Sequence, residues 1–413
     1  MLNEFVAWYF EILPKIENTI DLFDNFITFL QEHQFQIIRA NIGTRTLHPQ
    51  VETLSYLWAP YNLESMLETT VTPFFHSTRD FQVKSGLLKE SRFKVGSTSS
   101  TQFTKSPIQY ILSNNKSYSY QFTDEKPDEY PFPILEELAP FGASGYLAVP
   151  IVQKGNSLAF LSLLTKKPGG FSADDLDFLE KALKLISLKW MTFLQSEMTE
   201  SLLGIYLGKM TGSTVYSGKI YLGEHEKINS VVWFSDIRNY SGISEELSPT
   251  EVIQLLNAYF GLAIPIIESY GGEVLKLLGD GILAVFPYSN SNQVLVGKKV
   301  LLAVRKISDD LMNLNKKREK DGKIPFFHGV GLHSGEILYG NIGSKDRLDF
   351  TVIGEAVNLT SRIAGMCGEL KKAVLVSENL ADQVPVKWEY VGEHKLKGIS
   401  NPKRIFGISE KLK

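Results

Sequence analysis

The sequence predicts two α+β domains in a chain of 413 residues. A chain of this length exceeds what one hydrophobic core usually holds. The first half contains a clear β-hairpin. In the second half strands and helices alternate, which is typical of helices packed on a mixed sheet. Glycines recur through residues 199–228, between the two halves. We therefore predict an N-terminal α/β domain over residues 1–190, a helical, glycine-containing connector over 191–224 and a C-terminal α+β domain over 225–413.

The composition is that of an ordinary globular protein, with 43% hydrophobic and 22% charged residues. A formal net charge of −3 gives no basic face, so we expect no nucleic-acid partner. The single cysteine, Cys367, excludes an intrachain disulfide and fits a reducing cytoplasm. The N-terminal segment carries Glu4 and Glu11 and has no basic stretch, so we expect no signal peptide. We see no run of about 18 uncharged apolar residues and expect no transmembrane segment.

The N-terminal domain is predicted to open with a helix over residues 18–42. Apolar residues recur there at helical spacing, namely Ile20, Phe23, Ile27 and Leu30. Residues 45–92 have a mixed pattern. The Ser/Thr-rich segment 96–106 and the acidic, proline-containing segment 123–133 predict loops.

A β-hairpin is the clearest element of this domain, with strands Tyr146–Val152 and Leu158–Leu164 around the turn Lys154-Gly155-Asn156. Farther on, Ser172 is a predicted helix N-cap, with Asp175 three residues later as in a capping box. The helix that follows has apolar residues three or four apart: Leu176, Leu179, Leu183, Ile186, Trp190 and Phe193. Two interpretations remain open: the helix packs on its own sheet, or its C-terminal part pairs with a second subunit and links the domains.

The C-terminal domain is predicted from alternating strands and helices. The predicted strands cover residues 231–236, 273–286 (a pair), 326–333, 349–353 and 373–377, and the helices cover 249–268, 292–318 and 355–366. The first of these helices has the best-defined start, because Ser248, Pro249 and Glu251 form a capping box with proline at the first helical position. Its apolar residues should face the sheet: Val252, Leu255, Leu256 and Tyr259.

Two carboxylates follow strand-like runs in this domain. Asp236 ends the run that begins at Val231, and Asp280 lies in the turn Gly279-Asp280-Gly281. If the strand at 231 pairs beside the 273–286 hairpin, both carboxylates meet at one end of the sheet. Such oxygen ligands suit Mg²⁺ or Mn²⁺, which bind through one or two carboxylates plus substrate phosphates. Asp280 alone fits a hairpin turn equally well; the pair predicts a metal site.

Five further polar residues suit a nucleotide. Lys276 interrupts an apolar strand, and is either an edge-strand lysine or a donor to a base-ring nitrogen. Thr351 could place a hydroxyl in the same pocket, although a lone strand threonine is usually structural. Asn358 and Arg362 share one helix face, where an amide can orient a ribose and a guanidinium can hold phosphate and stabilise developing charge. Lys397 is a second phosphate cation or a solvated loop residue.

Residues 225–410 resemble the catalytic domain of class III nucleotidyl cyclases. Phe234-Ser235-Asp236-Ile237 resembles the first metal motif of that family, and Leu278-Gly279-Asp280-Gly281 resembles the second. The resemblance implies a ferredoxin-like βαββαβ core and two Mg²⁺ or Mn²⁺ ions per site. The implied site residues are Asp236, Ile237 and Asp280 for metal, Lys276 and Thr351 for adenine, Lys397 for the triphosphate, and Asn358 and Arg362 for the transition state.

The same resemblance implies a homodimer that converts ATP to 3′,5′-cyclic AMP and pyrophosphate. Guanylate-specific relatives carry Glu and Cys or a similar pair in place of Lys276 and Thr351, which favours ATP. A guanylate or mixed-specificity cyclase remains an alternative, because the Thr351 hydroxyl can donate or accept. Another is a ligand-binding sensor whose cyclase domain is weakly active or only dimerises. The signature of GGDEF-type diguanylate cyclases is absent from the sequence.

The sequence departs from the family pattern after the first metal motif. Asn239 stands where the family usually has glycine. Asparagine tolerates the left-handed conformation better than most residues, so the turn can form. Ser241 stands where threonine is common, which is a conservative change.

The N-terminal domain resembles a GAF-type sensory domain over residues 20–190. The resemblance depends on Gly145–Pro150, the hairpin that follows, and the segment Gly170–Leu176. It implies a regulatory domain that binds a small molecule such as a cyclic nucleotide or a chromophore, or that only dimerises. Because Cys367 lies outside this region, no cysteine is present to hold a bilin covalently.

Overall fold

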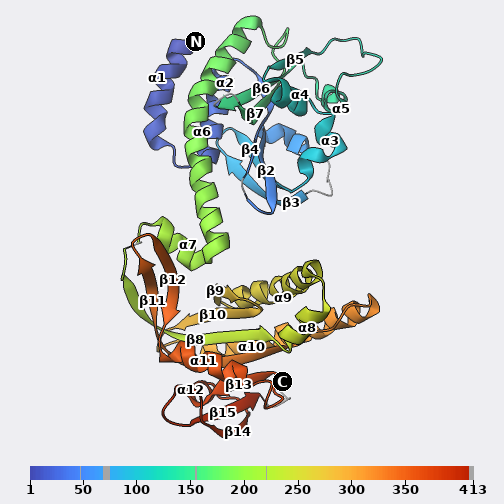
Figure 1. Ribbon diagram of the computed structural model, residues 1–413. Helices are drawn as coiled ribbons and strands as arrows, with labels where there is room; N and C mark the ends of the chain where they lie inside the picture. Colours follow the sequence, from blue (N-terminus) through green and yellow to red (C-terminus); the bar gives the residue numbers. More distant parts are fainter. Residues whose placement is uncertain (47, 68–74, 154–155, 220, 409–413) are drawn as a thin grey trace. The chain divides into compact units, whose positions relative to one another are not determined.

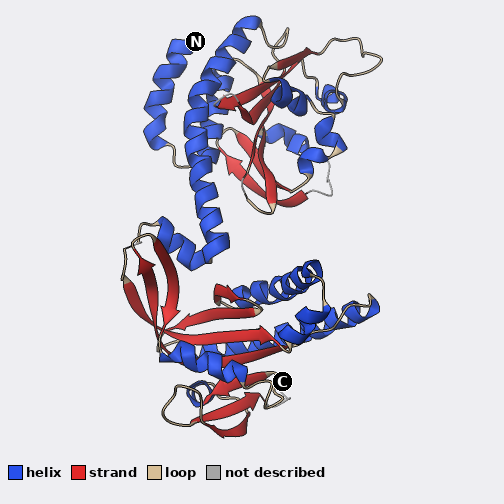
Figure 2. Ribbon diagram, in the orientation of Figure 1, coloured by secondary structure: helices blue, strands red, loops and turns tan. Residues whose placement is uncertain are grey.

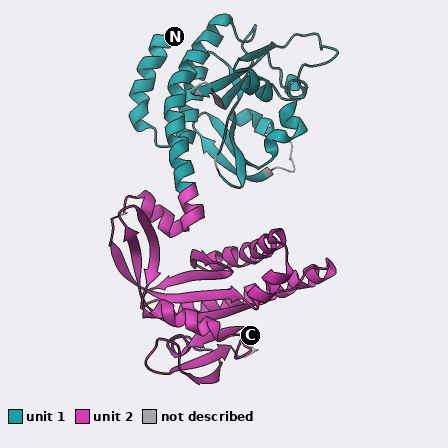
Figure 3. Ribbon diagram, in the orientation of Figure 1, with its two compact units in different colours: residues 1–201 teal, residues 202–413 magenta. Residues whose placement is uncertain are grey.

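The computed structural model describes residues 1–408, except 47, 68–74, 154–155 and 220. It divides into two compact units, Met1–Ser201 and Leu202–Lys413 (Figure 3). Each unit has its own sheet and its own hydrophobic core.

The first unit contains a seven-stranded antiparallel sheet in the order β3-β4-β2-β1-β7-β6-β5 (Figure 1). Its strands are β1 Ile37–Arg45, β2 Val51–Ala59, β3 Phe75–Val83, β4 Gly86–Lys94, β5 Tyr118–Gln121, β6 Gly145–Gln153 and β7 Asn156–Thr165. The pairing of β6 with β7 confirms the predicted hairpin strands. The predicted turn at Lys154 and Gly155 lies outside the described residues.

Helices cover both faces of this sheet (Figure 2). One face packs against the long helices α1 Leu2–Ile12, α2 Thr19–Glu32 and α6 Ala173–Leu207. The other carries shorter helices: α3 Thr101–Thr104, α4 Pro107–Asn114 and α5 Pro133–Leu138. The 3₁₀ turns are η1 Leu13–Lys15, η2 Tyr61–Leu67, η3 Ser97–Ser99 and η4 Ala139–Phe141. The unit is therefore a sheet between two helical layers, and its resemblance to a GAF-type domain stays a prediction.

Two element predictions in this unit are wrong. The helix predicted over 18–42 ends at Glu32, because Gln34 and Gln36 adopt positive φ angles of 63° and 48° and β1 begins directly afterwards. The segment 96–106 contains η3 and α3 instead of only a loop. The reason is its serines, since Ser100 caps α3 and Ser106 caps α4 by accepting backbone N–H groups.

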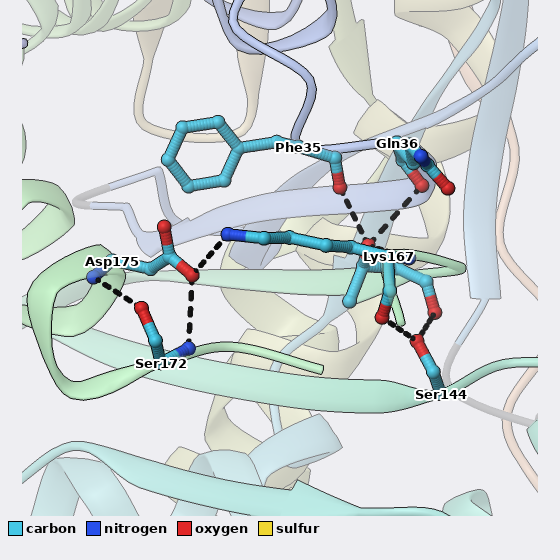
Figure 4. A network of polar contacts seen from close by, with 7 residues as sticks. Phe35, Gln36, Ser144, Lys167, Ser172 and Asp175 are labelled. Carbon is cyan, nitrogen blue, oxygen red and sulfur yellow. Dashed lines mark hydrogen bonds and ion pairs between the residues drawn. The ribbon is translucent and has the colours of Figure 1, made fainter. Parts of the chain in front are cut away.

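Helix α6 begins in a polar network that includes its predicted cap (Figure 4). The Ser172 hydroxyl accepts the Asp175 N–H at 3.2 Å, and the Asp175 carboxylate accepts the Ser172 N–H at 2.9 Å and Lys167 Nζ at 2.6 Å. Thr165 donates to the Phe35 carbonyl, and Ser144 donates to the carbonyls of Thr165 and Lys167. The predicted cap is confirmed, and the network joins the start of α6 to the end of β7.

The apolar stripe of α6 packs in the core of its own unit. Leu179, Leu183, Ile186 and Trp190 are all buried there. This is the first of the two interpretations left open by the sequence. Pairing of the C-terminal part of α6 with a second subunit stays a prediction.

The second unit contains an eight-stranded sheet in the order β14-β15-β13-β11-β8-β10-β9, with β12 paired only to β11. Its strands are β8 His225–Ile237, β9 Glu273–Leu278, β10 Gly281–Tyr288, β11 His328–Ser344, β12 Arg347–Ile353, β13 Val374–Ser377, β14 Trp388–His394 and β15 Lys403–Ile408. Its helices are α7 Lys209–Tyr216, α8 Tyr240–Glu246, α9 Pro249–Ser269, α10 Gln293–Lys320, α11 Glu355–Gly365 and α12 Glu378–Gln383. The strands β11-β8-β10-β9, all antiparallel to their neighbours and connected through α9 and α10, have the βαββαβ order expected of a ferredoxin-like core.

Helices α9 and α10 cover one face of this sheet and α11 packs on β11 and β8 from the other. The capping box of α9 is confirmed, because Ser248 accepts the Glu251 N–H while Glu251 accepts the Ser248 N–H. Within its predicted apolar stripe, Leu255 and Tyr259 are buried and Val252 and Leu256 are half-buried. The predicted strand over 326–333 is longer than expected: β11 continues to Ser344 and forms a hairpin arm with β12.

Helix α9 also bears on the predicted absence of a membrane span. It is the one helix in the described part of the chain that is long and apolar enough to cross a membrane by length and composition alone, with a mean hydropathy of 1.4. Four of its side chains, Leu255, Tyr259, Ala263 and Ile267, pack in the core of this unit. The absence of a transmembrane segment stays a prediction.

Candidate active site

The structure brings Asp236 and Asp280 together at one end of the second sheet. Strand β8 ends directly after Asp236 and pairs with β10, so the β9–β10 turn that carries Asp280 lies beside the end of β8. The Ile237 N–H donates to the Asp280 carboxylate at 3.0 Å. Gly279 permits this tight turn because it has a φ of 66°, which most side chains avoid.

Arg238 is a neighbour of the two carboxylates that the sequence reasoning missed. Its guanidinium forms an ion pair with Asp236, and the main-chain N–H of Arg238 donates to the Phe327 carbonyl at 2.7 Å. Gly329, opposite Asp236 on β11, leaves room for it: a Cβ atom there would lie 2.5 Å from the guanidinium. The available sequence signal was the position of Arg238 two residues after Asp236.

The donor set at this end of the sheet fits a hard divalent cation. Both carboxylates offer oxygen, and Asp236 Oδ1 already attracts a positive charge, because it forms the ion pair with Arg238. The described residues contain no cluster of three or more Asp, Glu, His or Cys side chains able to hold a metal. Main-chain oxygen, water and substrate phosphate can supply the remaining ligands. Ile237 can contribute only its carbonyl oxygen, because its side chain is a hydrocarbon and its N–H is a hydrogen-bond donor.

The turn after Asp236 has the conformation that the sequence predicted. Asn239 has φ 55° and ψ 32°, in the left-handed region, and helix α8 starts directly after it. Beneath the turn, Ser235 contacts the Tyr259 hydroxyl at 2.8 Å. Burial, assisted by the charge of Arg238, lowers the pKa of His328 to about 4. His328 is thus neutral near pH 7 and adds no second positive charge beside Arg238.

Lys276 lies on β9, the edge strand of the sheet, and its ammonium group pairs with Asp349 of β12. The expected neighbour was Thr351, which lies two residues farther along β12 and therefore on the same face. Lys276 pairs with Asp349 instead, because opposite charges attract between the hairpin arm and β9. Asp349 is thus a second residue that the sequence reasoning missed.

The remaining predicted residues point away from the sheet. Asn358 and Arg362 are exposed on α11, whereas Leu359 and Ile363 of the same helix are buried. Lys397 is exposed in the loop between β14 and β15. Within the described residues of a single chain, no side-chain hydrogen bond or ion pair joins these three residues to Asp236 or Asp280.

Comparison with known proteins decides the family of this unit. Residues 222–408 match the model of the adenylate and guanylate cyclase catalytic domain. These residues form a class III nucleotidyl cyclase domain. The resemblance stated for the second half of the chain is confirmed, and the family description covers both adenylate and guanylate cyclases.

Named relatives of the cyclase domain match only part of this chain. The terminal-differentiation-specific adenylate cyclase of Dictyostelium discoideum is 32% identical over 160 residues, 38% of this chain and 7% of that protein. The adenylate cyclase of Anabaena cylindrica is 32% identical over 162 residues, 39% of this chain and 32% of that protein. The structure of the adenylyl cyclase CyaB from P. aeruginosa is 26% identical, covering 46% of this chain and 97% of that one, with a TM-score of 0.42. The chain spans about a third or less of these two curated relatives.

The cyclase domain also holds the second helix of the connector. The Glu273 carboxylate on β9 accepts the N–H groups of Met210 and Thr211 at the start of α7, at 2.9 and 3.0 Å. The Thr211 hydroxyl contacts the Tyr339 hydroxyl at 2.6 Å. Helix α7 is therefore attached to the strand that carries Lys276.

Replacing Asp349 by alanine should raise the KM for the nucleotide and leave kcat nearly unchanged. The Asp349 side chain is 58% exposed, so the ion pair stabilises the position of Lys276 by only about 0.2–1 kcal/mol. Its loss should therefore raise KM by up to about fivefold. Steady-state kinetics of the variant measures both parameters. Asp346→Ala, an exposed carboxylate in the turn of the same hairpin arm, is the control. Identical kinetics for the two variants would show that Asp349 does not position Lys276.

Proposed function

We propose that the protein is a homodimeric adenylate cyclase that converts ATP to 3′,5′-cyclic AMP and pyrophosphate. In this proposal residues 1–190 are a regulatory domain, 191–224 a connector and 225–413 the catalytic domain. The observation that carries the proposal is the contact of the Asp280 carboxylate with Ile237, beside Asp236, in a nucleotidyl cyclase domain. It places two oxygen ligands where a nucleotide triphosphate and its metal can be bound.

The two carboxylates hold the metal in this mechanism. Two bound Mg²⁺ or Mn²⁺ ions would polarise the α-phosphate and make the ribose 3′-hydroxyl more acidic. Asp236 and Asp280 supply the negative charge that attracts the cations. Arg238 balances part of that charge in the free enzyme through its ion pair with Asp236.

The remaining residues bind and orient the nucleotide. Lys276 donates to a ring nitrogen of adenine and Thr351 contacts the same base, while Asp349 positions Lys276. Asn358 orients the ribose, and Arg362 stabilises the charge that builds on the transferring phosphoryl group. The Lys397 ammonium binds the triphosphate; it forms no ion pair with another described residue, so its charge is free for that role.

A site shared by two chains accounts for the exposure of Asn358 and Arg362. These side chains face away from their own sheet and make no polar contact with the carboxylate pair among the described residues of one chain. In a C₂ dimer, the pair from one chain can complete the site of the other, giving two equivalent sites. The monomer is then inactive.

Attachment of α7 to β9 supports regulation from the N-terminal side. Glu273 holds the start of α7, and Lys276 lies three residues farther along the same strand. A movement of the connector would therefore act on the strand that reads the base. The sign of this regulation is decided by comparing the full chain with residues 199–413.

Nucleotide turnover by the purified full chain tests the proposal. With Mn²⁺ and ATP, cyclic AMP and pyrophosphate should form in equal amounts, and GTP should react much more slowly. Comparable rates with both nucleotides would favour a mixed-specificity cyclase, which the Thr351 hydroxyl permits. Absence of any cyclic nucleotide from dimeric protein would favour a sensor whose cyclase domain only dimerises.

The double substitution Lys276→Glu and Thr351→Cys should weaken ATP use and shift preference toward GTP. Replacing a donor by an acceptor leaves an unpaired polar group against adenine, which costs about 1–3 kcal/mol, or roughly five- to 150-fold in kcat/KM. The ratio of kcat/KM for the two nucleotides measures the effect. Lys345→Glu, the same charge change at an exposed position of the hairpin arm, is the control. Unchanged ATP kinetics in the double variant would remove both residues from base recognition.

A further inference from the structure

A cavity of about 400 Å³ lies in the first unit, between its sheet and the layer of short helices α3, α4 and α5. Small-molecule sites usually measure about 300–1,000 Å³, so the cavity has the size of such a site. Its walls include the apolar side chains Phe93, Phe103, Ile108, Ile134 and Phe160. An apolar lining with a few polar groups is the usual composition of a ligand pocket.

Arg39 supplies a positive charge at the floor of this cavity. It lies on β1 and is half-buried, and its guanidinium forms no hydrogen bond or ion pair with another residue in the described part of the chain. Burial lowers its pKa, and the nearby Tyr146 and Glu137 act in the opposite direction. A desolvated guanidinium with five N–H donors is unfavourable unless a partner accepts from it. The cavity is where such a partner can enter.

Polar groups on neighbouring strands surround Arg39. Asn41 lies on the same face of β1, opposite Ser162 of β7, and accepts a hydrogen bond from the Ser55 hydroxyl at 2.6 Å. The Thr53 hydroxyl is buried without a partner among the described residues. Asn41, Thr53, Ser55 and Ser162 all line the cavity together with Arg39. One guanidinium and several hydroxyl and amide groups therefore face its interior.

The charges at the cavity favour an anion. Arg39 and Lys105 line it on the positive side and Glu137 on the negative side, which leaves one positive charge in excess. A guanidinium holds a carboxylate or a phosphate through two parallel hydrogen bonds. Phe103 and Phe160 offer flat apolar surfaces for the rest of a ligand.

We propose that this cavity binds a small organic anion with a flat apolar body, whose carboxylate or phosphate group is held by Arg39. The body lies against Phe103 and Phe160, and Thr53 and Ser162 offer hydroxyl groups at the polar end. The site is separate from the candidate active site, and the inference does not depend on the proposed cyclase activity.

Calorimetric titration of the full chain without nucleotide tests this site. The probes are 2-naphthoate, 2-naphthyl phosphate and the neutral 2-naphthamide, which share one apolar body. At least one anion should bind about tenfold or more tightly than the amide. The anion that binds more tightly shows whether the site prefers a carboxylate or a phosphate group.

Two substitutions at the cavity should act in opposite directions. Arg39→Gln should lower the affinity for the more tightly bound anion about tenfold or more, because it removes a charge-assisted hydrogen bond. The affinity for the amide should stay unchanged. Glu137→Gln, at an exposed position on α5, should strengthen anion binding because it removes a negative charge near Arg39. Arg79→Gln, an exposed arginine on β3 outside the cavity, is the matched control and should change nothing.

Several results would overturn the proposal. These are failure of all three probes to bind, equal affinity for the anions and the amide, or wild-type anion affinity in Arg39→Gln. Thermal melting shows whether Arg39→Gln folds. If Arg39→Gln does not fold, the Glu137→Gln variant tests the proposal instead. Unchanged anion affinity in Glu137→Gln would overturn the anion site at Arg39.

Discussion

Asp236→Ala and Asp280→Ala should each abolish cyclic nucleotide formation and leave the fold intact. Neither side chain belongs to the apolar core, and Asp236 is 29% accessible. Loss of either carboxylate removes a ligand of the cation that stabilises charge in the transition state. Removing one such stabilising group costs at least about a hundredfold in kcat. Turnover with saturating Mn²⁺ and ATP, together with thermal melting, measures both parts of the prediction.

Matched variants separate the loss of a ligand from a general effect. Asp236→Asn keeps the size of the side chain and removes its charge, so it should be as inactive as Asp236→Ala. Glu246→Ala removes an exposed carboxylate on nearby α8 and should retain activity. A variant at Asp236 or Asp280 with normal melting and more than a few per cent of wild-type activity would contradict the two-carboxylate site.

The local structure around each of these two carboxylates was predictable from sequence signals, whereas the pairing of β8 with β10 that brings them together was an assumption. Asp236 ends a predicted strand that begins with four apolar residues, and Asp280 lies in a Gly-Asp-Gly turn between two other mostly apolar strands. The capping box at Ser248 fixes the start of α9 between them, and Asn239 adopts the left-handed conformation that its residue type allows. Each of these features depends on a few neighbouring residues.

The contact of Lys276 with Asp349 depends instead on long-range structure. It exists because β11 continues well beyond its predicted end and, with β12, forms an arm that reaches β9. The apolar pattern of β12 shows which residues share a face, but it does not show which strand that face meets. Arg238 was missed for a similar reason, since the room for its guanidinium comes from Gly329 on another strand.

The cavity in the first unit could not be predicted from the sequence because one element prediction was wrong. With residues 37–42 read as helix, Arg39 and Asn41 fall on different faces. In strand β1 they are two residues apart on one face, beside Ser162 of β7. The chain leaves α2 through positive φ angles at Gln34 and Gln36, and neither residue type predicts such an angle. Tertiary packing of β1 between β2 and β7 decides the conformation there.

Mixing two inactive variants should restore activity if the site is shared between chains. Asp236→Ala and Arg362→Ala homodimers should both be inactive. In a heterodimer, one site carries both lesions and the other has Asp236 from one chain and Arg362 from the other, both unchanged. Random exchange makes half the dimers heterodimers with half their sites intact, which gives roughly a quarter of wild-type activity. Cyclic AMP formation, measured after exchange of equal amounts, checks this value.

A second mixture controls for the source of any recovered activity. Asp236 and Asp280 belong to the same end of one chain, because the Ile237 N–H binds the Asp280 carboxylate. Mixing Asp236→Ala with Asp280→Ala therefore leaves every site with one lost metal ligand, and no activity should return. Recovery in this control would place the two carboxylates in different sites. If mass spectrometry shows that subunits exchange and the first mixture stays inactive, Asp236 and Arg362 do not serve a shared site, and the exposed face of α11 has another role.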